Sequence, residues 1–160
     1  MAYAARTDVS ASKSRDEIER TLTRYGADQF MYGWDADQAL VQFRMPVEAP
    51  EGAPAFRQVR FLIPMPDKTE RRFTHHSRGK RTPAAAEKEW EQATRQKWRA
   101  LALVVKAKLE AVEAGLSEFE TEFLGHVVMP DGRTVAEHAR PLVAKSYATG
   151  TPQLLLPPAR

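Results

Sequence analysis

Cysteine is absent from this sequence of 160 residues. Its absence excludes a disulfide framework, a zinc site built from thiolates and a cysteine nucleophile, and it is typical of a protein in a reducing compartment. Long apolar runs are missing too: the longest, Ala100–Val105, is far shorter than the roughly 18 residues of a membrane span. The first twenty residues contain no apolar run of signal-peptide length. We therefore expect a cytoplasmic protein that is neither secreted nor inserted in a membrane.

Sequence motifs of common enzymes are likewise missing. Gly79 and Lys80 do not complete a nucleotide-binding loop, because the spacing G-x-x-x-x-G-K-[ST] is not found and no predicted strand directly precedes them. No nucleophile with a base and an orienting group is recognisable either. The sequence therefore predicts a protein that is not an enzyme, with no cofactor and no catalytic residue.

The composition that remains is that of a folded globular protein. Apolar residues make up 42% and charged residues 28% of the chain, and a chain of this length usually forms one core. We predict a flexible arm at residues 1–11, a single α+β domain at 12–150, and a tail rich in proline and leucine at 151–160. Within the tail, Leu154–Leu156 would either dock on the core or bind a partner.

The first half of the predicted domain is a helix followed by three strands. Ser14 and Glu17 have the spacing of a capping box, which predicts a helix over residues 13–25 that Gly26 closes. Apolar and polar residues then alternate in three stretches separated by turn signals, the pattern of an antiparallel sheet. The predicted strands span residues 29–34, 38–45 and 56–63.

A long helix dominates the second half. Thr82 is the predicted N-cap and Pro83 the first helical residue, and the pattern continues to Gly115, which gives a helix of about 50 Å. Two shorter helices are predicted from capping boxes at Ser117 with Glu120 and at Thr134 with Glu137. Pro141 would kink or end the last helix. The predicted fold class is α+β: an N-terminal helix, a three-stranded antiparallel sheet, one long amphipathic helix and short C-terminal helices.

The net charge of +3 hides a strong segregation along the chain. Residues 68–108 carry twelve Lys or Arg and four Glu, a local charge of +8, whereas the other residues carry twelve basic and seventeen acidic side chains. Because a field of one sign attracts a polyanion, nucleic acid is the predicted partner of the basic region. The alternative is a solvated helix whose charges are mixed and pair with one another.

On a helical wheel, the long helix has an apolar face and an opposite basic face. The basic face carries a cationic row, which consists of Lys88, Arg95, Arg99 and Lys106. The row is about 27 Å long, several phosphate spacings of a nucleic-acid strand. Such a row suits contacts with the phosphate backbone that do not read sequence. Neighbouring glutamates, among them Glu87, Glu91 and Glu113, could instead pair with some of these cations.

Further basic residues extend this predicted surface. Residues 67–82 are predicted to be a loop that is mobile without a ligand. Its cations are typical of arms that wrap phosphates: Arg71, Arg72, Arg78, Lys80 and Arg81. Arg44 and Arg60 would continue the surface across the sheet. The three tryptophans, Trp34, Trp90 and Trp98, are interpreted as core residues rather than as platforms for base stacking.

One acidic stretch offers an alternative chemistry. Glu118, Glu122 and His126 are spaced so that one helical face would present two carboxylates and an imidazole to a divalent ion. The competing interpretation is a solvated helical face, and Gly125 would end the helix before His126 aligns. We therefore assign no metal ligand, and a metal-dependent nuclease stays a lesser hypothesis.

Five stretches of the chain resemble a family found in tailed phages and prophages of high-GC bacteria, whose members have no assigned activity. The stretches are EIERTLTRYG at 17–26, VRFLIPMP at 59–66, WRALALVVKAKLEAVEAG at 98–115, FETEFL at 119–124 and PDGRTVAEH at 130–138. The resemblance implies a small phage-encoded protein that works in the cytoplasm of the infected cell. It transfers no functional residue.

These observations lead to three hypotheses. The first is a non-enzymatic, largely sequence-independent nucleic-acid-binding protein, with DNA favoured over RNA, that acts in recombination or on single-stranded DNA and forms homo-oligomers. Its order of elements is similar to the core of single-strand annealing proteins and to a double-stranded-RNA-binding domain, which is an analogy of fold only. The second is an inhibitor or adaptor that binds a host protein through the basic row and the apolar tail. The third is the metal-dependent nuclease.

Overall fold

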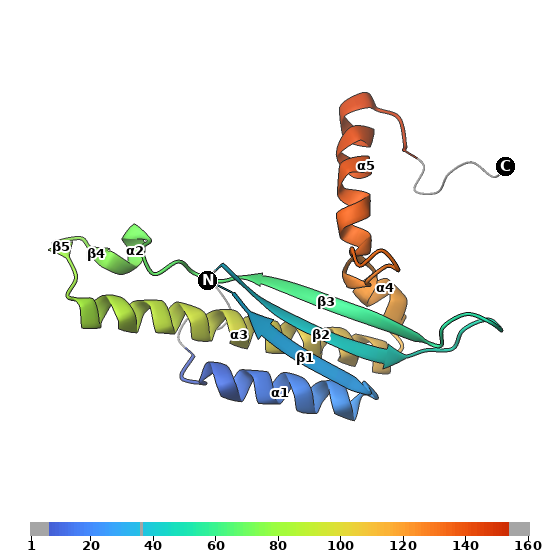
Figure 1. Cartoon of the computed structure of the whole chain (residues 1–160), viewed down its shortest axis with the longest axis horizontal. Helices are drawn as coiled ribbons and strands as arrows, with labels where there is room; N and C mark the ends of the chain where they lie inside the picture. Colours follow the sequence, from blue (N-terminus) through green and yellow to red (C-terminus); the bar gives the residue numbers. More distant parts are fainter. Residues whose placement is uncertain (1–6, 36, 154–160) are drawn as a thin grey trace.

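A computed structural model of the chain describes residues 7–35 and 37–153. The architecture is α+β, with the predicted N-terminal helix, three-stranded sheet, long helix and short C-terminal helices (Figure 1). In chain order the elements are α1 (Ala11–Arg24), β1 (Gln29–Trp34), β2 (Gln38–Pro46), β3 (Phe56–Pro64), α2 (Arg71–Thr74), β4 (His75–His76), β5 (Gly79–Lys80), α3 (Pro83–Glu113), α4 (Phe119–Phe123), the 3-10 helix η1 (Leu124–His126) and α5 (Val135–Thr149).

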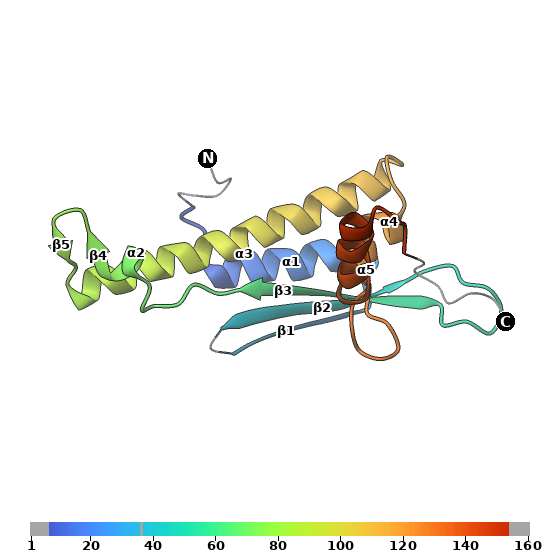
Figure 2. The same cartoon turned by 90° about the horizontal axis from the view of Figure 1, so that it is seen from above.

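The main sheet is an antiparallel meander in the order β1-β2-β3. Its strands match the predicted ranges to within one residue, because alternation of apolar and polar residues fixes which side faces the core. Val41 and Phe43 of β2 lie opposite Phe61 and Val59 of β3, and all four are buried. Helices α1 and α3 lie side by side on one side of this sheet and close the core against it (Figure 2).

Strand β1 is less buried than its pattern and the predicted core position of Trp34 indicate. Phe30 is half-buried, but Tyr32 is 43% exposed and Trp34 is 74% exposed. Edge position is not the reason, because β3 is an edge strand as well and Val59 and Phe61 on it are buried. The helices that pack on the sheet leave the end of β1 uncovered. Trp34 is therefore not a core residue.

Helix α1 begins earlier than predicted. The side chain of Ser10 accepts a hydrogen bond from the backbone amide of Lys13 at 3.2 Å, so Ser10 is the N-cap and the helix starts at Ala11. Ser14, the predicted cap, is a buried residue inside the helix. Ile18 is buried in the core, and Gly26 follows the helix with a φ of 98°, a conformation that favours glycine.

Helix α3 confirms the prediction at both ends. Thr82 accepts a hydrogen bond from the amide of Ala85, Pro83 is the first helical residue, and the helix runs to Glu113. Its predicted apolar face is buried: Trp98 is only 3% exposed, and Val105 is fully enclosed. The helix is about 46 Å long and lies along the long axis of the molecule (Figure 1).

The segment 67–82, predicted to be a loop, contains secondary structure. A one-turn helix, α2, is followed by the short hairpin β4–β5, in which His75 pairs with Lys80. Phe73 of α2 is buried, and Gly79 has a φ of 134°. These elements are too short to produce a recognisable periodicity, which is why the sequence did not predict them.

The C-terminal part differs from the prediction at one cap. Helix α4 has Glu118 as its N-cap with no capping side-chain bond, so the box predicted at Ser117 and Glu120 is wrong. The capping box of Thr134 and Glu137 is confirmed, and Pro141 lies inside α5 without ending it. No residue of α5 is buried, and the helix projects from the sheet and the long helices (Figure 1). Leu154–Leu156, for which docking on the core or binding of a partner was predicted, lie outside the described residues.

Candidate nucleic-acid interface

The cationic row of α3 does not form a continuous free surface. Arg99 makes an ion pair with Glu17 of α1, and its side chain is 24% exposed because α1 packs beside it. The Arg95 guanidinium donates to Gln92 at 2.5 Å and lies 3.9 Å from Glu91. Lys106 lies 3.8 Å from Glu110 of the next turn. Within the described part of the chain, Lys88 alone in this row has no ion pair.

The two arginines predicted to extend the surface across the sheet are also engaged. Arg44 makes two hydrogen bonds with the Asp28 carboxylate, at 2.8 and 2.7 Å, and its guanidinium lies 5.1 Å from the centre of the Phe56 ring. The bidentate pair lowers the pKa of Asp28. Arg44 therefore ties the strand β2 to the turn that precedes β1.

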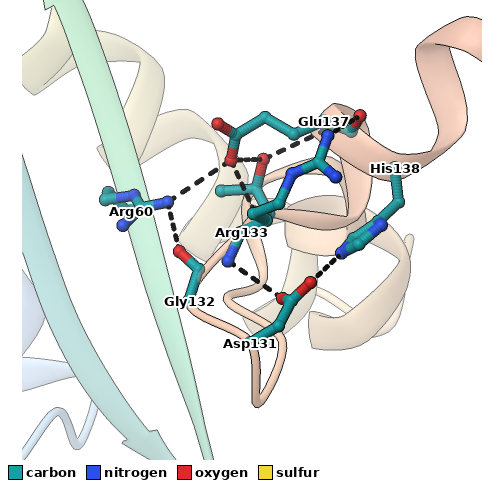
Figure 3. Close-up of polar contacts among 7 residues, drawn as sticks. Arg60, Asp131, Gly132, Arg133, Glu137 and His138 are labelled. Atoms are coloured by element: carbon teal, nitrogen blue, oxygen red, sulfur yellow. Dashed lines mark hydrogen bonds and ion pairs between the residues drawn. The ribbon is translucent and has the colours of Figure 1, made fainter.

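Arg60 anchors the start of α5 to β3 (Figure 3). Its Nη2 donates to the Gly132 carbonyl at 2.8 Å and to the Glu137 carboxylate at 3.3 Å. The same carboxylate accepts the backbone amide of Thr134 at 2.6 Å and its hydroxyl at 2.9 Å. These bonds, led by the amide, lower the pKa of Glu137, and Arg60 adds to the effect. Arg60 thus has a structural role that its place on a glutamine-rich strand face did not indicate.

Among the basic residues predicted to form the interface, those without an ion pair to any described residue are concentrated in the basic tip, defined as residues 71–81. Its sequence RRFTHHSRGKR holds five cations and no acidic side chain. Arg81 holds the tip together, since its guanidinium donates to the carbonyls of His75 and Arg72 and its amide to Thr74. Arg72 pairs with Glu70 at 2.7 Å.

The other cations of the basic tip point to solvent. Arg71, Arg78 and Lys80 are exposed, and none of them makes an ion pair with any residue that the structure describes. Lys88, also exposed, lies on the second turn of α3, directly after the tip. These four cations form the candidate interface for phosphate.

Contacts at the base of the tip fix it against α3. The Trp90 indole donates to the Pro66 carbonyl at 2.6 Å, and the Lys68 ammonium lies 4.0 Å from the centre of the Trp90 ring. Lys68 also pairs with Glu87 at 2.7 Å. The tip consequently stands at one end of α3, and α4 and α5 lie toward the other end (Figures 1 and 2).

An aromatic cluster on the free edge of the sheet was not predicted as a site. The Tyr32 and Trp34 rings are nearly parallel, with an interplanar angle of 14° and centroids 6.2 Å apart. Arg15 of α1 lies over the Tyr32 ring at 4.9 Å and over Trp98 at 5.2 Å. The signal that could have revealed this cluster is the alternation in β1, which places Tyr32 and Trp34 next to each other on one face of the strand.

The acidic triplet considered for a metal does not come together. Glu122 accepts a hydrogen bond from Lys108 at 3.2 Å, while the His126 ring stacks on Phe61 with centroids 4.1 Å apart. Burial lowers the pKa of His126. Across residues 7–35 and 37–153, no group of three His, Asp or Glu side chains is arranged to hold an ion.

A groove with an acidic rim lies at the opposite end of α3 from the basic tip. Its volume is about 740 Å³, and its walls come from the ends of α1, β2 and α3 together with α4. Its acidic residues are Glu48, Glu113, Glu118 and Glu120. The charge segregation of the sequence is therefore also a separation in space.

No protein-family model matches the chain, and neither a curated protein nor a solved structure matches it. The resemblance to phage proteins stays a prediction. Among the described helices, none combines the length and the apolar character that crossing a bilayer requires.

Proposed function

We propose that this protein binds nucleic acid, DNA in preference to RNA, through phosphate contacts made by the basic tip and Lys88. The observation that carries the proposal is the absence of ion pairs at Arg71, Arg78, Lys80 and Lys88 among the described residues, although most other cations of the basic region are paired. Recombination or the handling of single strands in a phage-infected cell is the setting we propose.

The chemistry of the tip suits backbone contacts rather than base reading. Arginine presents a planar fork of donors to phosphate, and lysine adds a point charge. Helix α2 has four residues, which is too short to lie along a groove, and β4–β5 is a hairpin of two residue pairs. We therefore expect binding without sequence preference. The affinity should fall as the salt concentration rises, because counterion release then contributes less to the binding free energy.

The test removes two tip charges and compares the result with an equal loss of charge elsewhere. The variant Arg78→Ala/Lys80→Ala is matched by Arg140→Ala/Lys145→Ala, whose exposed cations lie on α5. Fluorescence anisotropy with labelled oligonucleotides at about 50 and 200 mM salt should show weaker binding for the tip variant only. For a single strand, its log–log salt slope should be shallower by about 1.4, or about 0.7 for each lost phosphate contact. If both variants bind equally well, the basic tip is not part of the nucleic-acid interface.

As a second candidate function, we propose that α5 binds a protein partner, the inhibitor or adaptor role. The observation in favour is the exposure of its apolar side chains, 49% for Val143 and 88% for Tyr147. An isolated helix of 15 residues is marginal in water, so a partner that covers this face would stabilise it. A photo-crosslinking residue in place of Tyr147 should give one discrete adduct in host extract. The same residue in place of Leu116, equally exposed after α3, is the control, and similar labelling at both positions would argue against this role.

A further inference from the structure

The strongest unexplained feature of the surface is the exposed aromatic pair of β1. Tyr32 is 43% and Trp34 74% exposed, so two large aromatic side chains lie next to each other in water. A contiguous exposed patch marks a binding site, whereas a single exposed apolar residue does not. Met31, on the other side of the same strand, is exposed as well. The edge of the sheet therefore presents apolar side chains to an external ligand.

Packed neighbours support Tyr32, the inner ring of the pair. Tyr32 packs edge-on against the buried Trp98, with centroids 6.5 Å apart and an angle of 86°. Arg15 lies over both of these rings and fixes Tyr32 between α1 and α3. Trp34 then lies nearly parallel to Tyr32. Little conformational entropy would be lost when a flat ligand stacks on this pair.

The platform lies at the end of the sheet from which the basic tip departs. Trp34 is the last residue of β1, and the turn after it is bonded to the chain that leaves β3, since the amide of Met65 donates to Asp37. One residue later, the carbonyl of Pro66 accepts the Trp90 indole at the base of the tip. The same arrangement is visible in both views (Figures 1 and 2). A ligand that reaches both places must carry negative charge along its length and flat apolar groups beside it.

Single-stranded nucleic acid has this chemistry. We infer that Tyr32 and Trp34 form a stacking site for unpaired nucleobases, which would make the interface selective for single strands. This inference rests on the proposed function, because the phosphates of the same strand would bind the basic tip. Every base has a π-face, so stacking tolerates any sequence, whereas the bases of a duplex are already stacked on one another. The Arg15 guanidinium beside Tyr32 adds a cation at the platform itself.

The test separates bases from phosphates by means of three probes: oligothymidylate, an abasic oligonucleotide of the same length, and a duplex of the same length. Trp34→Ala should weaken binding of oligothymidylate about tenfold, and leave the other two affinities unchanged. Trp34→Phe should retain most of the affinity because it keeps an aromatic face. Thermal unfolding of both variants checks that the exposed position has not altered the fold.

Intrinsic fluorescence gives an independent readout. The chain has three tryptophans, of which Trp98 is buried and Trp90 is half-buried beneath Lys68. Stacking on Trp34 should therefore quench a large part of the emission when oligothymidylate binds, and the abasic probe should not. In Trp34→Phe the quenching should disappear while binding persists.

Three results would overturn the inference. The first is binding of oligothymidylate by Trp34→Ala as tight as that of the parent protein. The second is an equal loss of affinity for the abasic probe. The third is dissociation of a dimer by Trp34→Ala, which would make β1 a contact between copies. If the parent protein binds none of the probes, the proposed function fails as well. If Arg78→Ala/Lys80→Ala loses affinity for all three probes and Trp34→Ala loses none, only the stacking site is refuted.

Discussion

Arg99 of α3 and Glu17 of α1 form an ion pair across the interface of the two helices that cover the sheet. The sequence alone placed Arg99 on a free basic face. Its partner is 82 residues away in the chain, and only the packing of α1 against α3 brings the two side chains together. Arg99, predicted to contact phosphate, therefore joins α1 to α3 instead.

Removing this pair should affect stability and leave binding intact. Arg99→Ala is expected to lower the free energy of unfolding by about 1 kcal/mol, since both side chains are partly exposed and solvent screens their attraction. Urea denaturation of Arg99→Ala, Glu17→Ala and the double variant measures the coupling in a double-mutant cycle. If Arg99→Ala lost as much nucleic-acid affinity as Arg78→Ala/Lys80→Ala does, Arg99 would belong to the nucleic-acid interface after all.

The two tryptophans whose rings lie 6.2 and 6.5 Å from Tyr32, Trp34 and Trp98, should respond differently to truncation. Trp98→Ala should destabilise the fold by about 3 to 5 kcal/mol, because its buried indole supports Tyr32 and the α1–α3 contact. Trp34→Ala should change the free energy of unfolding by no more than about 0.5 kcal/mol. Urea unfolding curves decide both values, and a large loss of stability in Trp34→Ala would mean that its ring has an unrecognised role in packing.

The start of α5 should respond to acid. The hydrogen bonds from Thr134 and the nearby Arg60 hold the pKa of Glu137 below its usual range, and the amide of Arg133 and then His138 do the same for Asp131. A depressed pKa in the folded state means that these carboxylates stabilise the fold above the unfolded pKa, near 4. This contribution is lost as the pH falls through the folded pKa values. Carbon NMR of the Glu137 carboxyl should give a titration midpoint below that of an unperturbed glutamate, and a midpoint at or above that reference would contradict the geometry of Figure 3.

The basic tip should depend on one buried ring. Phe73→Ala removes no charge, but it deletes the side chain that packs the tip on the body of the protein. We expect faster hydrogen exchange at the β4–β5 amides, unchanged exchange at Val41 and Val59 in the sheet, and a several-fold loss of nucleic-acid affinity because the cations are no longer held together. Phe56→Ala, at an exposed ring, is the control. Full affinity in Phe73→Ala would indicate that the tip binds as an unstructured basic arm.

The parts of the fold that the sequence predicted are those set by local chemistry. Thr82 and Pro83 begin α3 because a hydroxyl acceptor and a preset φ act within one turn, and the alternation of Val41, Phe43 and Met45 places β2 correctly. The cap of α1 was misplaced because Ser10 and Ser14 are chemically equivalent caps one turn apart. Only burial of Ser14 distinguishes them.

The candidate site was harder to predict because it depends on which charges find partners. Arg60 and Arg44 resemble surface cations in the sequence, yet their partners, Glu137 and Asp28, are brought close by the sheet and by α5. The exposure of Trp34 likewise depends on how far the helices cover the sheet, a property of packing rather than of composition. Ion pairing and coverage both arise only when the elements assemble.

The separation of the basic tip from the groove with the acidic rim gives the molecule an electric dipole moment along α3. A polyanion exerts a torque on such a dipole before any contact is made, and it turns the tip toward itself while the acidic end is repelled. The protein would therefore be oriented before contact. Added salt would lower the association rate constant more than it would raise the dissociation rate constant. A 31-residue helix that holds unlike charges at its two ends would thus orient the protein in the field of the proposed polyanion.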